Sequence, residues 1–76
     1  MDIASAFGKV LRDERKKRGL TQEQLALEAD LRRTFVSSVE LGQKLPSIIT
    51  IFKLAQALKI TVSALMQETE NEVSKN

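Results

Sequence analysis

The side chains best suited to recognition chemistry lie between residues 21 and 42, in the segment TQEQLALEADLRRTFVSSVELG. The spacing of its apolar residues predicts two short helices joined by a tight turn. Val36 and Val39 would point inward from the second helix, and its outer face would carry Arg33, Thr34, Ser37 and Ser38. A guanidinium can donate two hydrogen bonds to guanine O6 and N7, and hydroxyls can bond to base edges. The pattern is typical of a helix that reads bases in the major groove of DNA.

The composition gives little indication of a catalytic site. The chain contains no Cys and no His, which excludes disulfides, thiolate or imidazole zinc sites, and Cys–His or Ser–His nucleophile pairs. The carboxylates that could be considered as acid–base pairs fall on solvated helix faces among basic residues; they are Asp13, Glu14, Glu23 and Glu28. We therefore expect no enzyme activity, no catalytic residue, no metal, no cofactor and no small-molecule ligand.

Five helices are expected to position the reading face. Helical spacing predicts the first over residues 2–18, and the next two over 22–29 and 32–41. Thr21 and Gln24 form a capping-box pattern, while Ser47 and Thr61 are expected to cap the fourth and fifth helices. The buried stripe of the fourth is predicted to be Ile48, Ile51, Phe52, Ala55 and Leu58. This predicts an all-α, compact five-helix bundle over residues 1–66, followed by a polar tail over 67–76 that frays.

Length and charge agree with one small binding domain. Of 76 residues, 42% are hydrophobic, which suffices for a packed core, and the only aromatic residues are three Phe, so this core must be aliphatic. Residues 9–18 hold six basic and two acidic side chains, whereas residues 68–72 hold three Glu and no base. A basic front half suits a polyanion as partner. No apolar run approaches the roughly 20 residues of a membrane span, and the charged N-terminus does not fit a signal peptide, so we expect a cytoplasmic protein.

The run GLTQEQLALEADLRRTFVSSVELGQKLPS, followed by IFKLAQALKI and TVSAL, resembles the phage repressor and Cro-type helix-turn-helix family. The resemblance extends over residues 7–66. Within the family, the chain is most similar to the small controller proteins of restriction–modification systems. The resemblance implies a lambda-repressor-like domain that regulates transcription by binding a double-stranded DNA operator.

Individual roles follow from that resemblance at the matching positions. It implies base reading by Arg33, Thr34, Ser37 and Ser38, and phosphate contacts by Gln22, Arg32, Gln43 and Lys44. It also implies an ion pair between Arg15 and Glu40 that holds the reading helix in place. The chain departs from the family pattern at four positions, where Asp30 and Lys59 replace common glycines, Arg32 replaces a small polar cap, and Leu45 replaces Asn.

A hydrophobic residue in an unusual position points to self-association. Ile49 falls off the predicted buried stripe, on a side where such helices are normally polar. An exposed apolar cluster suggests a partner surface, so we predict a two-fold homodimer interface formed by Ile49, Phe52, Val62, Leu65 and Met66. An alternative interpretation is a protein-interaction module, such as the DNA-binding antitoxin of a toxin–antitoxin pair.

Overall fold

Five α-helices account for most of residues 1–75, which is the part of the chain that the computed structural model describes, and no strand occurs among these residues. The helices are α1 (Ile3–Lys17), α2 (Gln22–Ala29), α3 (Arg33–Glu40), α4 (Ile48–Leu58) and α5 (Val62–Ser74). The predicted all-α architecture is confirmed.

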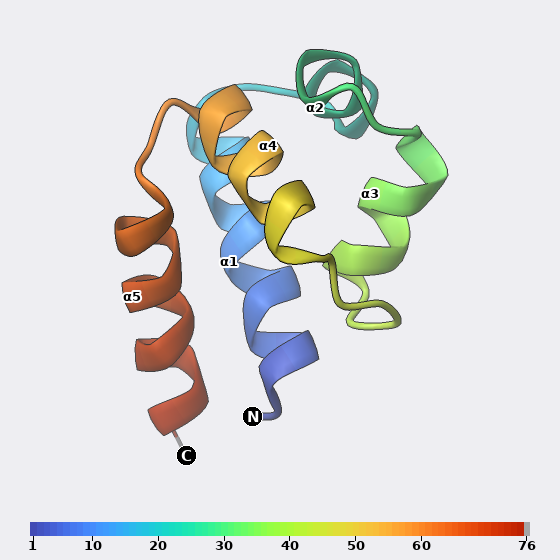
Figure 1. The fold of residues 1–76 in the computed structure, drawn as a ribbon. Coiled ribbons are helices and arrows are strands. Elements are labelled where there is room, and N and C mark those ends of the chain that lie inside the picture. Colours follow the sequence, from blue (N-terminus) through green and yellow to red (C-terminus); the bar gives the residue numbers. More distant parts are fainter. Residues whose placement is uncertain (76) are drawn as a thin grey trace.

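Helix α1 runs through the middle of the molecule, with α5 packed on one side of it and α3 on the other (Figure 1). Helix α2 packs against both α3 and α4. The most deeply buried side chains are aliphatic: Leu11, Leu25, Leu54, Leu58, Leu65, Val36 and Val39. Phe7 is the only aromatic residue in the buried core of the described chain. The aliphatic core expected from the composition is therefore observed.

Local capping signals set where the helices begin. Thr21 Oγ1 accepts a hydrogen bond from the Gln24 amide at 3.0 Å, and the Gln24 side chain accepts one from the Thr21 amide at 2.8 Å, so the capping box is confirmed. Ser47 and Thr61 cap α4 and α5 as predicted. Helix α3 starts at Arg33, one residue after the predicted start, with Arg32 as its N-cap. The Arg32 side chain has no acceptor atom and makes no capping bond.

Two helices end in the left-handed conformation without glycine. Asp30 ends α2 with φ 57° and Lys59 ends α4 with φ 58°. These are the two positions at which the sequence departs from the glycines of the family pattern. Asp tolerates this conformation better than most residues do, whereas a lysine there is strained.

The prediction of a frayed tail from residue 67 is wrong for residues 67–74, which continue α5. Thr69 is buried and its hydroxyl donates to the Leu65 carbonyl at 2.9 Å. Lys9 of α1 also contacts Glu72 at 3.3 Å. Packing against α1 therefore orders a segment whose polar composition suggests disorder. Residue 76 of the predicted tail lies outside the described residues.

The predicted buried stripe of α4 is wrong at its N-terminal end. Ile48 is 62% exposed and Phe52 is 58% exposed, while the buried residues of the helix are Leu54, Ala55 and Leu58. The buried face of the helix is the one that contains Leu54, and Ile48 and Phe52 do not lie on it. The first turns of α4 are left with an uncovered apolar side.

Among residues 1–75, no single helix combines the length and the apolar composition needed to cross a membrane. Helices α4 and α5 would meet those criteria only together, and the chain bends by 104° between them.

Candidate nucleic-acid interface

A charged network fixes α3 to the centre of the fold. The Arg15 guanidinium donates to both carboxylate oxygens of Glu40, with Nε–Oε2 at 2.7 Å and Nη2–Oε1 at 3.0 Å. Its third nitrogen donates to the Leu20 carbonyl at 2.8 Å. The two charged side chains are only 10% and 3% exposed, and the hydrogen bonds to Glu40 raise the pKa of Arg15 above its ordinary value. This bidentate pair, predicted from the resemblance, locks the orientation of α3 relative to α1.

Gly8 lets α1 and α3 approach closely. A Cβ atom at this position would lie 2.4 Å from the Val39 carbonyl oxygen and 2.7 Å from that of Glu40. Any side chain there would therefore push the two helices apart. Together with the ion pair, this contact makes α3 a rigid element.

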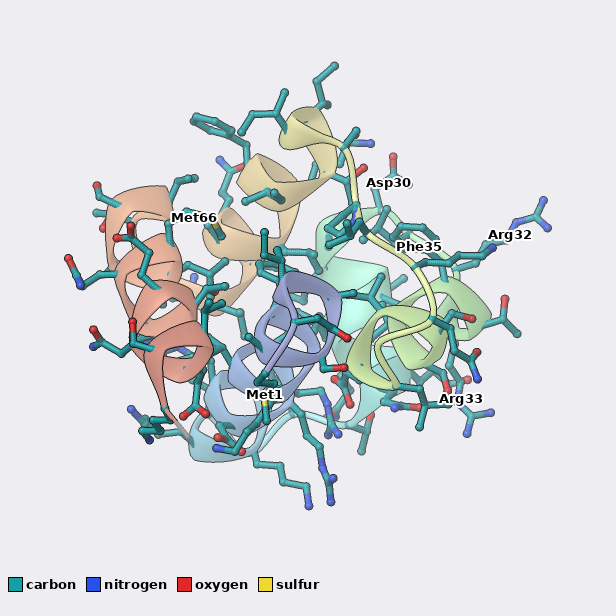
Figure 2. The ribbon with its side chains drawn as sticks, turned by 90° about the horizontal axis from the view of Figure 1, so that it is seen from below. Met1, Asp30, Arg32, Arg33, Phe35 and Met66 are labelled. Atoms are coloured by element: carbon teal, nitrogen blue, oxygen red, sulfur yellow. The ribbon has the colours of Figure 1, made fainter. Side chains whose placement is uncertain are left out.

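The outer face of α3 carries the predicted base-reading residues. Arg33 and Thr34 are exposed, and Ser37 and Ser38 are half-buried. In Figure 2 the side chains of Arg32 and Arg33 extend away from the bundle into solvent. The Ser38 hydroxyl donates a hydrogen bond to the Thr34 carbonyl at 3.0 Å. Its oxygen can still accept a hydrogen bond from a donor on a base edge. The four side chains line one shallow hollow.

The predicted phosphate contacts surround this face. Arg32, Gln43 and Lys44 are exposed, and the Lys44 ammonium lies 5.9 Å from the centre of the Phe35 ring. Gln22 is half-buried, and its amide donates to Glu40 Oε1 at 3.1 Å. This contact joins Gln22 to the Arg15–Glu40 pair, a link that the sequence analysis missed. Because eighteen residues separate the two side chains, no local pattern could have revealed it.

Leu41 was not predicted as a site residue, yet it is 67% exposed and lines the same hollow as the predicted base-reading residues. Its spacing from Ser38 and Thr34, three and seven residues along the helix, was the available signal. Phe35, half-buried beside Arg32 in a second hollow, was likewise not assigned.

The predicted dimer surface is partly present as an exposed patch. Ile49 and Phe52 are 68% and 58% exposed, and Val62 and Met66 are half-buried. Phe52 and Val62 line one groove between α4 and α5, and Met66 lies between these two helices in Figure 2. The assignment of Leu65 to this interface is wrong, because Leu65 is fully buried in the core of its own chain. Leu45 and Ile48, both exposed, extend the apolar surface and were missed.

The chain resembles known proteins over the helices that carry this candidate interface. A family model described as helix-turn-helix matches residues 11–65, a range that contains the whole of α2, α3 and α4. The control protein C.MunI of Mycoplasma sp is 40% identical over 72 residues, covering 93% of this chain and 97% of that protein. The immunity repressor protein of Bacillus phage phi105 is 41% identical over 61 residues, covering 80% of this chain and 42% of that protein. The crystal structure of the restriction-modification controller protein C.AhdI from Aeromonas hydrophila superposes with a TM-score of 0.80 at 44% identity, covering 82% of this chain and 94% of that one.

Proposed function

The chain belongs to the helix-turn-helix family of transcriptional regulators, as its sequence suggested, and on this premise we propose that it controls restriction–modification genes by binding an operator as a homodimer. The observation that carries the proposal is the geometry of α3. Its outer face presents an exposed guanidinium and hydroxyls, while its inner face is locked to α1 by a bidentate ion pair. A fixed helix with free donors is what base reading requires.

In the proposed complex, α3 lies in the major groove and Arg33 donates to a base edge, with guanine as its preferred partner. Thr34, Ser37 and Ser38 have shorter side chains and supply hydrogen bonds to base edges that lie closer to α3. Arg32, Gln43 and Lys44 contact phosphates and set the register of the protein on the duplex. Gln22 lies at the N-terminus of α2, where backbone amides attract a phosphate, and its contact with Glu40 orients the side chain.

Self-association is supported by the apolar patch on α4 and α5. Exposed side chains of Ile48, Ile49 and Phe52 stand next to the groove lined by Phe52 and Val62. A two-fold axis through this patch would pair identical surfaces and bury them from water. It would also present two copies of α3 to half-sites about one helical turn, or ~34 Å, apart on one face of the DNA.

The antitoxin alternative is not favoured by the comparisons. A relative that matches this chain nearly end to end is a control protein, and a solved structure with 44% identity is that of a restriction-modification controller. We therefore propose gene control as the function, with the chain's own promoter among its targets.

Selection of bound duplexes from a random pool, at a stated salt concentration, tests the proposal. We expect enrichment of two inverted half-sites with centres about one helical turn apart. The affinity for the selected duplex should exceed that for a scrambled duplex by a factor of ~10³ or more. Equal competition between the two duplexes would contradict sequence-specific regulation.

A further inference from the structure

We propose that Leu41 reads the 5-methyl group of a thymine at a defined position in each half-site. This inference rests on the proposed function, because it requires α3 to enter the major groove. It adds a fifth specificity residue, and the only apolar one, to the face formed by Arg33, Thr34, Ser37 and Ser38.

The position of Leu41 supports this role. Leu41 ends α3 with φ −81° and ψ −1°, so its backbone remains right-handed and continues the helical stripe. Residues three, four and seven apart share a helix face, which places Leu41 in line with Ser38, Ser37 and Thr34. All four line the hollow over α3 together with Arg33 and Gln43, and Leu41 is the only apolar residue among the six.

Leu41 also lies within reach of the bases. Helix α3 spans eight residues, which corresponds to a length of about 12 Å. The major groove is about 12 Å wide and admits a helix, whose diameter with side chains is about 10–12 Å. In the proposed complex Leu41 faces the groove together with Ser37 and Ser38, because the three residues share one side of α3. Short side chains at Ser37 and Ser38 leave space beside the isobutyl group of Leu41.

The chemistry of the groove then identifies the ligand. The major-groove edges of the base pairs present mainly hydrogen-bond donors and acceptors, and thymine alone carries a methyl group there. Leu41 is 67% exposed in the free protein, so a contact with that methyl group would remove apolar surface from water on both partners. Burial of one methyl-sized group corresponds to about fourfold in affinity.

The test uses the selected operator with single thymines replaced by deoxyuridine, which removes only the methyl group. For the wild-type protein we expect replacement of the contacted thymine in one half-site to weaken binding about fourfold. Replacement of the corresponding thymines in both half-sites should weaken it about 16-fold. The Leu41→Ala variant loses the contact in both protomers, so it should bind the thymine operator about 16-fold more weakly and should lose all sensitivity to that replacement. Leu41→Met, which keeps an apolar side chain of similar volume, should retain the sensitivity.

Leu27→Ala is the matched control, because Leu27 is 82% exposed on α2 and does not line the hollow. This variant should keep the wild-type response to deoxyuridine. Sequence-specific binding in which no thymine replacement is coupled to Leu41 would overturn this inference and leave the proposed function intact. Loss of all preference for the selected duplex over a scrambled one would overturn both.

Discussion

At the scale of single residues, the orientation of the reading face depends on side chains that lie behind it. Glu40 accepts hydrogen bonds from Arg15 and from Gln22, so one carboxylate connects α1, α2 and α3. Removing one partner of such a buried pair leaves an uncompensated charge, which is far more costly than the net gain from the intact pair. The network therefore fixes the orientation of α3, whose outer face carries Arg33, the residue proposed to read a base.

Arg33→Ala should cost about 1–3 kcal/mol of operator binding and relax the preference at one base pair per half-site. The neighbouring Arg32→Ala is the control, because loss of a phosphate contact should weaken cognate and scrambled duplexes alike and should lower the salt dependence of binding. Fluorescence titration of both duplexes at several salt concentrations measures both effects. An unchanged base preference in Arg33→Ala would remove this residue from the reading role.

At the scale of helices, the contact between α1 and α3 has no room for a side chain at Gly8. Alanine normally stabilises a helix interior by up to about 1 kcal/mol relative to glycine. Gly8→Ala should instead destabilise the protein by about 1–3 kcal/mol, because its Cβ would overlap the carbonyls of Val39 and Glu40. Urea unfolding measures the change, and Arg12→Ala on the exposed side of α1 should stay within about 0.5 kcal/mol of wild type. A stabilised Gly8→Ala variant would show that α1 and α3 can move apart at Gly8 without loss of stability.

The contact between α1 and α5 brings two carboxylates together. Glu14 is 3% exposed and accepts hydrogen bonds from Arg18 Nη1 at 2.8 Å and from Lys17 Nζ at 3.2 Å. Burial first, and then the neighbouring Glu14 carboxylate, raise the pKa of Glu68 above its ordinary value of 4.5. A raised pKa in the folded state means that ionised Glu68 opposes folding. This penalty is absent below pH 4.5 and develops as the pH rises through the folded-state pKa.

Glu68→Gln should therefore make the protein more stable than wild type at pH 7, and the advantage should shrink as the pH falls below 4.5. Urea unfolding of both proteins at a series of pH values follows the difference. Glu70→Gln, on an exposed position of the same helix, serves as the control for removing a charge from α5. An advantage that persists at low pH would indicate that the ionisation of Glu68 is not its cause.

Considered as a complete molecule, a single chain leaves the apolar side of α4 exposed to solvent. Leu45, Ile48, Ile49 and Phe52 are each at least 58% exposed within eight residues of sequence. In a chain of 8.5 kDa, such a patch exposes apolar surface that a second copy would remove from water.

Ile49→Glu should weaken self-association, because two like charges would be brought together in the paired patch. Sedimentation velocity should show wild type at about twice the monomer mass of 8.5 kDa and the variant shifted toward the monomer. Leu27→Glu introduces the same kind of charge on α2, outside the patch, and should sediment like wild type. Equal association of all three proteins would refute the α4–α5 interface.

Features that depend on neighbours within one helical turn could be predicted from the sequence. The Thr21–Gln24 capping box, the starts of the helices to within a residue and the shared face of Arg33 and Ser37 follow from residue type and from the 3.6-residue period. The same local signals carried the resemblance to helix-turn-helix proteins.

The packing of the five helices set which faces remain exposed to solvent. It buried Leu65, exposed Ile48, joined Gln22 to Glu40 and extended α5 over a polar segment. These outcomes depend on how helices distant in sequence cross and cover one another. Periodicity marks an apolar stripe to within a residue or two, but the packing partner selects which part of that stripe is removed from water.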